Sequence, residues 1–468
     1  MRRALVVCVV LSVFAACGGA SSGQRTVLVD YDGDEFSSSV FSNYPAKLEA
    51  KPGQTVVFKQ AWTGEPHTVT GGAFVNDVLA KSKDWLAFFE NFDKLLASGA
   101  DIPDPENPGE ATFAQFAAGL ASAKNKKAAK LTGDAWRALR ANGATLPDLD
   151  NPGEVSWADA VTAIDEESDK AFSGVPFAFE DEGSIAQNVG QPCFKRKGAL
   201  PLEAATPCAK AQQVQPAFDG KQSVYNSGLI RYEGVRGNSF KVKLADEIDP
   251  GTYYFYCAVH GFGQLTELKV KPKDAKVESA AEVARRARAQ AEDTLRPLAK
   301  VYRQTVRSGR LTLHGEKLKG PFAGLYAEGA DHALINEFLP HRITAKVNEP
   351  ITWTALGSDH TISFDVPKYF PIIEFDTPKG IRLNPRLSRP AGGAPEIPKP
   401  DETDEESHED HGGPLTIDGG TYDGSGFWSS GLFGSEPYAK YTLRISKPGT
   451  YPYACLIHPP MIGQIVVT

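Results

Sequence analysis

The sequence predicts a mainly β protein that contains two related units. The turn Pro-Gly-Thr-Tyr occurs at residues 250–253 and again at residues 448–451, and each copy leads into a segment that ends in Cys-x-x-His. Gly and Pro are abundant, with 44 and 33 of the 468 residues, as expected of a chain with many turns between strands. The repeated lead-in and the turn-rich composition together indicate duplicated β units.

Length and charge limit the classes of function. A chain of 468 residues is long enough for several domains that each have a core of their own. The formal net charge is −8 and the sequence has no basic block. We therefore expect no binding to nucleic acid.

The N-terminus has the pattern of a secretion signal, which we assign to residues 1–16. Arg2 and Arg3 precede an apolar run that is too short to span a bilayer as a helix. The signal predicts a protein that works outside the cytoplasm, in the periplasm or at the cell surface.

Residues 14–17, Phe-Ala-Ala-Cys, resemble the processing site of bacterial lipoproteins, although Phe14 is not the residue favoured at its place. The resemblance implies a lipid on Cys17, with residues 17–25 as a flexible Gly- and Ser-rich tether. The alternative is ordinary signal cleavage, in which Cys17 has no role. In the first case the lipid is the only attachment to a membrane that we expect.

Residues 26–271 form the first unit. Its segments alternate apolar and polar side chains, which is typical of half-buried strands. Tyr253, Phe255 and Cys257 lie on one face of the last strand before the Cys-x-x-His loop, because side chains alternate along a strand. The predicted strands are residues 26–30, 46–50, 55–60 and 239–244 and the segment that ends at Cys257.

A large insertion at about residues 75–215 separates His67 from Cys257. Its first part has helical patterns, and residues 92–104 match residues 136–148 in an internal repeat with a period of 44. We interpret the acidic residues of the repeated loops as helix caps and solvated positions, because Pro and Gly break the spacing of a calcium loop. The expected helices are residues 75–98, 112–131, 134–142 and 156–172.

Residues 272–310 are expected to form a helical linker, with Pro297 as a kink or a boundary between two helices. Residues 311–468 form the second unit, which repeats the strand, loop and His-Thr pattern of the first at His360. An acidic, Pro- and Gly-rich loop at about residues 391–413 is expected to be disordered. Its two histidines, His408 and His411, either bind metal weakly or belong to a plain acidic loop.

The six cysteines are assigned one by one. Cys8 is removed with the signal and Cys17 takes the lipid. Cys193 and Cys208 have no other role, and an oxidising compartment favours a disulfide between them. Cys257 and Cys455 each stand three residues before a histidine, so a metal ion is the simplest partner for both. The alternative is a disulfide between these two, which would require both to abandon the same local pattern.

The second unit carries the more complete set of metal ligands. Cys455, His458 and Met461 stand three residues apart on one loop, and His360 lies upstream. A thiolate, two imidazoles and a weak axial thioether are the donors of a mononuclear blue-copper site. This pattern resembles the cupredoxin family, specifically its amicyanin, pseudoazurin and plastocyanin group, over roughly residues 26–70, 216–271 and 311–468. The resemblance implies two Greek-key β-sandwich domains, with copper held by His360, Cys455, His458 and Met461.

The first unit departs from the family pattern at the axial place. His67, Cys257 and His260 fill the other three places. Aligning Gly263-Gln264 with Gly463-Gln464 makes the loop two residues shorter and puts Gly263 where Met would stand. Gln264 is a candidate axial ligand, because an amide oxygen can replace the thioether. Alternatively, Gln264 only matches Gln464, and the site has three ligands or a backbone carbonyl. We expect copper in this site too.

The resemblance implies a one-electron carrier and no enzyme activity. The resemblance also implies that the His458 imidazole reaches the surface, and the apolar residues around it predict a patch on which a redox partner protein docks. Multicopper enzymes need His-x-His or His-Cys pairs, and none of the nine histidines forms one. His314, His332 and His341 have no assignment. The alternatives are copper delivery, storage or resistance without electron transfer, and a partner-binding scaffold with a degenerate first site. The sequence does not indicate the oligomeric state.

Overall fold

The computed structural model describes most of the chain between residues 24 and 468. The N-terminal signal, Cys17 with most of the tether, Cys208, and His408 and His411 lie outside the described residues, so the predictions made for them stay predictions. The described residues are 24–31, 33, 35–60, 65–105, 108–172, 192–197, 209–230, 237–313, 315–327, 330, 332–366, 373–376, 380–395, 415–434 and 438–468.

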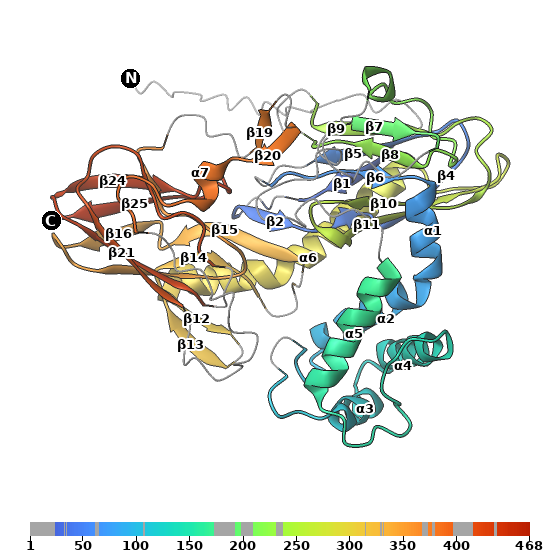
Figure 1. Cartoon of the computed structure of the whole chain (residues 1–468), viewed down its shortest axis with the longest axis horizontal. Helices are drawn as coiled ribbons and strands as arrows, with labels where there is room; N and C mark the ends of the chain where they lie inside the picture. The colour runs from blue at the N-terminus through green and yellow to red at the C-terminus, as the bar shows by residue number, and fades with distance from the viewer. Residues whose placement is uncertain are drawn as a thin grey trace, which may run out of the picture.

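The structure is mainly β, as predicted, with two groups of sheets and a helical region attached to the first group (Figure 1). The first group contains a four-stranded sheet in the order β3-β1-β5-β9 and a six-stranded sheet in the order β4-β11-β10-β6-β8-β7. Its strands are β1 (Gln24–Val29), β3 (Asn43–Tyr44), β4 (Lys47–Ala50), β5 (Thr55–Gln60), β6 (Thr70–Gly71), β7 (Pro192–Lys195), β8 (Val224–Ser227), β9 (Ser239–Lys243), β10 (Gly251–Cys257) and β11 (Gly261–Val270).

The second group contains a six-stranded sheet, β2-β15-β14-β17-β23-β21, and a five-stranded sheet, β16-β25-β24-β18-β22. Two hairpins, β12-β13 and β19-β20, and the short helix α7 (Pro385–Ser388) accompany them. The strands are β2 (Ser38–Val40), β12 (Arg310–Leu313), β13 (Glu316–Lys319), β14 (Phe322–Leu325), β15 (Ala333–Leu339), β16 (Arg342–Ala345), β17 (Ile351–Ala355), β18 (Ser363–Phe364), β19 (Ile373–Asp376), β20 (Gly380–Leu383), β21 (Thr416–Tyr422), β22 (Trp428–Ser429), β23 (Lys440–Ile445), β24 (Gly449–Ala454) and β25 (Ile462–Val467).

Each group buries one core between its two sheets. Strands such as β1, β5 and β23 alternate buried and less buried residues, so one face of each strand points into a core. In the first group Phe58 of β5 packs with Phe255 of β10, with ring centroids 5.5 Å apart. In the second group Trp353 of β17 packs with Tyr453 of β24. Aromatic pairs between the two layers therefore fix the strands that lead to the Cys-x-x-His loops.

The insertion is helical, but its boundaries differ from those predicted. The helix expected at residues 75–98 is divided at Ser82, whose hydroxyl donates to Ala171 O at 2.9 Å. The helices expected at 112–131 and 134–142 are also wrong in extent, because Asn125 caps a new helix by accepting from Ala128 N and Gly133 is buried inside it. The helices are α1 (Ala73–Lys81), α2 (Lys83–Ala97), α3 (Phe113–Ser122), α4 (Lys126–Ala141) and α5 (Trp157–Phe172), and the short 3-10 helix η1 (Lys210–Gln212) follows.

The 44-residue repeat is visible in how its two copies meet. Phe113 N donates to Val155 O at 2.9 Å, and the matching Trp157 N donates to Ala111 O at 2.7 Å. These reciprocal hydrogen bonds join the two loops, and the side chains of Phe113 and Trp157 share one buried core. The acidic residues Asp148 and Asp150 pair with arginines of α4.

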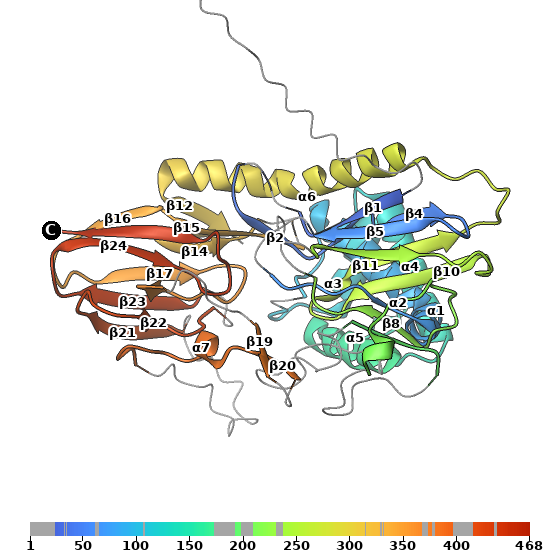
Figure 2. The same cartoon turned by 90° about the horizontal axis from the view of Figure 1, so that it is seen from above.

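Helix α6 (Ala280–Ser308) lies lengthwise along both groups of sheets (Figure 2). It runs through Pro297 as one helix, so the expected boundary between two helices is wrong. Ser279 and Glu282 form a capping box at its start, and Gly309 ends it in the left-handed conformation. Its buried face, which includes Ala291 and Leu298, shares a core with residues of both groups of sheets. Among the described helices, none combines the length and apolar character needed to cross a bilayer.

Strand β2 ties the start of the chain to the second group. It lies within the range expected for the first unit, but it pairs antiparallel with β15 through Ser38↔Ile335 and Val40↔Ala333. Asn336 N also donates to Ser37 O at 2.8 Å. Together with α6, this pairing connects the two groups directly, through main-chain hydrogen bonds and a shared core.

The core beneath α6 can be tested with two substitutions in this helix. Leu298 is fully buried, so Leu298→Ala should lower the free energy of unfolding by about 2–5 kcal/mol. Val306 is 54% exposed, and Val306→Ala should change the free energy of unfolding by no more than about 0.5 kcal/mol. Urea unfolding followed by circular dichroism measures both. Equal effects would contradict the packing described for α6.

Candidate metal centres

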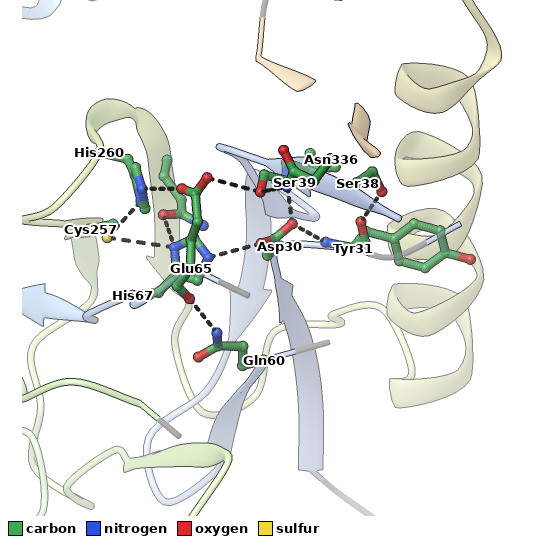
Figure 3. A network of polar contacts seen from close by, with 12 residues as sticks. Asp30, Tyr31, Ser38, Ser39, Gln60, Glu65, His67, Cys257, His260 and Asn336 are labelled. Atoms are coloured by element: carbon green, nitrogen blue, oxygen red, sulfur yellow. Dashed lines mark hydrogen bonds and ion pairs between the residues drawn. The ribbon is translucent and has the colours of Figure 1, made fainter. Parts of the chain in front are cut away.

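The first centre consists of His67, Cys257 and His260. His67 follows β5 and forms an isolated bridge with Ile230, Cys257 is the last residue of β10, and His260 lies in the turn to β11. Cys257 Sγ lies 3.9 Å from His67 Nδ1 and 3.6 Å from His260 Nδ1. Figure 3 shows the two imidazoles directed toward the sulfur. The three donor atoms could therefore hold one metal ion.

The second centre consists of His360, Cys455 and His458. His360 is held by a pair of hydrogen bonds with Phe433, and the other two residues come from the loop after β24. Cys455 Sγ lies 3.5 Å from His458 Nδ1, and the Nδ1 atoms of the two histidines are 3.2 Å apart. In each centre the donor atoms lie within 4.8 Å of one another. Strands far apart in the sequence thus produce the same arrangement twice.

The residue after the first histidine fixes the sulfur in each centre. Thr68 N donates to Cys257 Sγ at 3.3 Å, and Thr361 N donates to Cys455 Sγ at 3.4 Å. The hydroxyl oxygens of the same threonines accept the next backbone N–H, from Ala258 and from Leu456. The repeated His-Thr dipeptide therefore links the histidine strand to the cysteine loop in both units.

Met461 lies in the second centre's loop and is fully buried in the same core cluster as Cys455. Cys455 N donates to Met461 O at 3.0 Å, and Met461 N donates to His458 O at 2.8 Å. These two hydrogen bonds close the loop tightly. Cys455, His458 and Met461, which stand three residues apart in the sequence, therefore lie together in one tight loop.

The strand register corrects the predicted alignment of the two loops. Tyr256, the residue before Cys257, pairs with Leu265; the register then shifts, and Cys257 pairs with Gly261. In the second unit Ala454, the residue before Cys455, pairs with Ile462, so Leu265 and Ile462 hold equivalent positions. Gln264 thus corresponds to Met461. The Gly-Gln alignment is wrong, because the first loop is one residue longer rather than two shorter.

Gln264 and Gln464 therefore occupy different places. Gln464 pairs with Pro452, and Glu267 holds the equivalent position opposite Tyr254 in the first unit. Gln264 is fully buried, and its Oε1 lies 2.9 Å from His67 Nδ1. The structure brings Gln264 to the first centre and leaves Gly263 exposed.

Three of the four histidines bind a carboxylate through their second ring nitrogen. His67 Nε2 lies 2.9 Å from Asp30 Oδ2, and the Nε2 atoms of His260 and His458 lie 2.9 Å from the two oxygens of Glu65. The fourth, His360 Nε2, has Ser358 Oγ at 3.5 Å. A ring that donates its Nε2–H in this way presents the Nδ1 lone pair to a metal. Neither Asp30 nor Glu65 was predicted from the sequence, because no local motif marks them.

The arrangement of lone pairs fits a bound cation. Two imidazole Nδ1 atoms 3.2 Å apart beside a sulfur repel one another unless a positive charge lies among them. In the first centre Gln264 aims its oxygen at His67 Nδ1, while its amide nitrogen is buried without a hydrogen-bond partner. A metal ion that accepts the nitrogen and oxygen lone pairs would relieve both conflicts.

Protons supply this positive charge when metal is absent. Burial lowers the pKa of His67, but Asp30 and Cys257 outweigh it and raise the pKa to about 10. Burial also lowers the pKa of His260 and of His458, but the neighbouring cysteine and Glu65 outweigh it. They raise the pKa of His260 to about 9 and that of His458 to about 10.

The cysteine thiols and Glu65 shift in the opposite direction. Burial raises the pKa of Cys257 and of Cys455, but the neighbouring histidines outweigh it and hold each pKa well below its usual value. Burial also raises the pKa of Glu65, and its two histidine partners outweigh it in the same way. Each centre is therefore arranged as thiolate and imidazolium.

The expectation of an exposed His458 is wrong. His458 is 1% exposed because Glu65, from the first unit, covers its outer edge. Of the apolar residues around it, Leu456 is buried and Pro459 is exposed. The neighbouring Ile462 is 59% exposed. An apolar surface is thus present on this loop, but the imidazole is not part of it.

The remaining histidines and cysteines have other surroundings. His332 lies 3.6 Å from Asp93, and His341 lies 2.5 Å from Glu337, so each of these two histidines has an acidic neighbour outside the two centres. His314 is outside the described residues. Both Cys257 and Cys455 are free, so the alternative of a disulfide between them is wrong. Cys193 is buried on β7, and its pairing with Cys208 stays a prediction.

No protein-family model matches this chain, and no curated protein matches it. Among solved structures, the oxidized form of plastocyanin from Dryopteris crassirhizoma matches with 21% identity, over 28% of this chain and 89% of that one, at a TM-score of 0.14. Amicyanin from Paracoccus versutus matches with 15% identity, over 28% and 73%, at a TM-score of 0.14. At these TM-scores the likeness carries no argument, and the proposals below rest on the geometry of the two centres.

Metal binding to either centre should release protons. The raised histidine pKa values mean that His67, His260 and His458 are protonated at pH 7 without metal, so a metal ion must displace these protons. Affinity should therefore fall as the pH falls. Calorimetric titration with Zn²⁺ in two buffers of different ionisation enthalpy counts the protons. A protein that binds Zn²⁺ without proton release would contradict the charge arrangement, and the double variant Cys257→Ser, Cys455→Ser serves as control.

Proposed function

We propose that this chain is an exported copper protein that carries single electrons with two mononuclear centres. The observation that supports it most directly is the donor set, one thiolate and two imidazole Nδ1 atoms, found twice with Met461 or Gln264 at the same strand position. A trigonal Cys-His-His set with a weak fourth ligand is typical of blue-copper sites. Cupredoxin domains of the Greek-key type are the fold that we propose for both units.

The donors favour copper over zinc. Structural zinc sites use four strong ligands in a tetrahedron, drawn from Cys, His and carboxylates. Each centre here offers three such ligands, and the fourth candidate is a thioether or an amide oxygen, both weak donors for Zn²⁺. The soft sulfur atoms suit Cu(I), and the imidazoles suit both oxidation states of copper.

Burial favours electron transfer over catalysis. His360, Cys455 and His458 are all at most 2% exposed, which leaves little access for a substrate. Thr361 N and the Phe433 main chain hold the donors through hydrogen bonds, so their positions should differ little between oxidation states. A bound copper ion supplies the one-electron chemistry, and the protein holds the ligand geometry constant around it.

The first centre is proposed as functional rather than degenerate. Its three donor atoms lie within 4.8 Å of one another, as do those of the second centre, and Gln264 would offer an amide oxygen where the second centre would offer the Met461 thioether. Because the thioether is the softer donor, we propose that the two centres have different reduction potentials.

Location and partner follow from sequence signals. We propose that the protein is exported and held on the membrane by a lipid on Cys17, with a disulfide between Cys193 and Cys208. We also propose that a redox partner protein docks near His458, on the exposed apolar residues Pro459 of the same loop and Ile462 at the start of β25. A small apolar patch of this kind suits a redox partner that binds weakly and dissociates quickly.

Copper loading of single-site variants tests the proposal. The wild type should bind two copper ions and show an intense thiolate-to-Cu(II) absorption band with a matching EPR signal. Cys257→Ser and Cys455→Ser should each bind one ion and keep the band of the other centre. Copper analysis, absorption and EPR measure this. Copper-free protein with no such band after loading would refute the proposed function.

Exchanging the axial side chains tests their role. Gln264→Met should raise the potential of the first centre and Met461→Gln should lower that of the second, because the thioether favours Cu(I) and the amide oxygen favours Cu(II). We expect shifts of at least about 59 mV, which corresponds to about 1.4 kcal/mol for one electron. Redox titration measures both. Gln464→Met is the matched control and should leave both potentials unchanged, since Gln464 stands elsewhere on β25.

A further inference from the structure

One carboxylate contacts a ligand histidine of each centre. Glu65 Oε2 lies 2.9 Å from His260 Nε2, and Glu65 Oε1 lies 2.9 Å from His458 Nε2. His260 and His458 are the histidines of the two Cys-x-x-His loops, which come from different units. The outer edges of these two imidazoles are therefore separated by a single carboxylate group and two hydrogen bonds (Figure 3 shows the His260 side).

The surroundings hold Glu65 in this position. Ser39 Oγ donates to Glu65 Oε1 at 3.0 Å, and Gln60 Nε2 donates to the Glu65 main-chain oxygen at 2.9 Å. Ser39 belongs to β2, the strand that pairs with β15, and its hydroxyl accepts from Asn336 Nδ2. Glu65 is thus held by its carboxylate to β2 in the second group of sheets and by its main chain to β5 in the first, through groups other than the two histidines.

The contact is mostly shielded from water. The side chains of Glu65, His260 and His458 are 14%, 15% and 2% exposed. A hydrogen bond between a charged and a polar group is stronger in such a setting than on an open surface. Asp30 makes the same kind of contact with His67, but it reaches only the first centre. Glu65 is therefore placed to affect both centres at once.

We propose that Glu65 couples the two metal centres, by orienting His260 and His458 together and by forming the route along which one electron passes between them. The proposal deepens the proposed function and rests on it. The transfer oxidises one centre by one electron and reduces the other by one electron. No covalent bond forms or breaks, and Glu65 keeps both hydrogen bonds, so no proton has to move.

Metal affinity tests the shared orienting role without electron transfer. Glu65→Gln keeps the shape of the side chain but leaves one oxygen, so at least one histidine loses its acceptor and the other contact loses its charge. In the full chain, Zn²⁺ affinity should fall about tenfold at each centre, as measured separately in the Cys257→Ser and Cys455→Ser backgrounds. Asp30→Asn is the matched control and should weaken only the first centre. If Glu65→Gln lowered the Zn²⁺ affinity of only one centre, the proposal that Glu65 orients both histidines would be overturned.

The electron route is tested in the copper-loaded protein. Flash reduction with less than one equivalent of reductant, followed by absorption, gives the rate at which the two centres equilibrate within one molecule. After correction for the measured potentials, Glu65→Gln should slow this step about tenfold, and Glu90→Gln, which changes an exposed carboxylate paired with Lys47 and Lys94, should leave it unchanged. Equal rates in the wild type and Glu65→Gln would overturn the route.

Failure of this proposal and failure of the proposed function give different results. A protein that never forms the copper band refutes the function, whereas normal copper bands with unchanged Zn²⁺ affinities and rates refute only the role of Glu65. Should Glu65→Gln not fold, Ser39→Ala removes the donor to Glu65 Oε1 while leaving the carboxylate in place. It should then weaken Zn²⁺ binding at the second centre more than at the first, and an unchanged affinity would count against the proposal.

Discussion

The hydrogen bond at the outer nitrogen of each candidate ligand histidine is the constraint on which the two clusters depend. An imidazole has two nitrogens, and a fixed partner at one of them decides where the lone pair of the other points. Asp30 and Glu65 supply this partner for three of the four rings. Without it, a ring could rotate away from the sulfur, and the donors gathered by the strands would not meet at one point.

The sequence predicted the candidate ligands that stand in local patterns, and the structure brings them together in two clusters. Cys257, His260, Cys455 and His458 share a four-residue motif, and the His-Thr step marked the distant histidines. The acidic partners could not be predicted in this way, because Glu65 meets His458 across 393 positions. Such a contact depends on how two units pack, which no local pattern records.

The fourth position of the two clusters shows a different limit. The dipeptides Gly263-Gln264 and Gly463-Gln464 follow the two loops and are identical, which favours aligning them with each other. The strand ladder sets the correspondence instead, and one extra residue in the first loop moves Gln264 to the place of Met461. Matching the dipeptides displaces the strand by three residues, and any odd displacement reverses the face of every side chain, so residue identity alone is a poor guide to the alignment. The burial of His458 was missed because the contact that covers it is equally non-local.

Strand β2 has a consequence for how the molecule is assembled. It is synthesised almost 300 residues before β15, with which it pairs, so the sheet of the second unit stays incomplete until both ends of that span have emerged. A fragment that began at residue 311 would present the free main-chain groups of β15 as an open edge, ready to recruit a strand from another molecule. The second unit therefore cannot complete its sheet without the start of the chain. A protein truncated at the apparent domain boundary would aggregate more readily than it would fold as an independent domain.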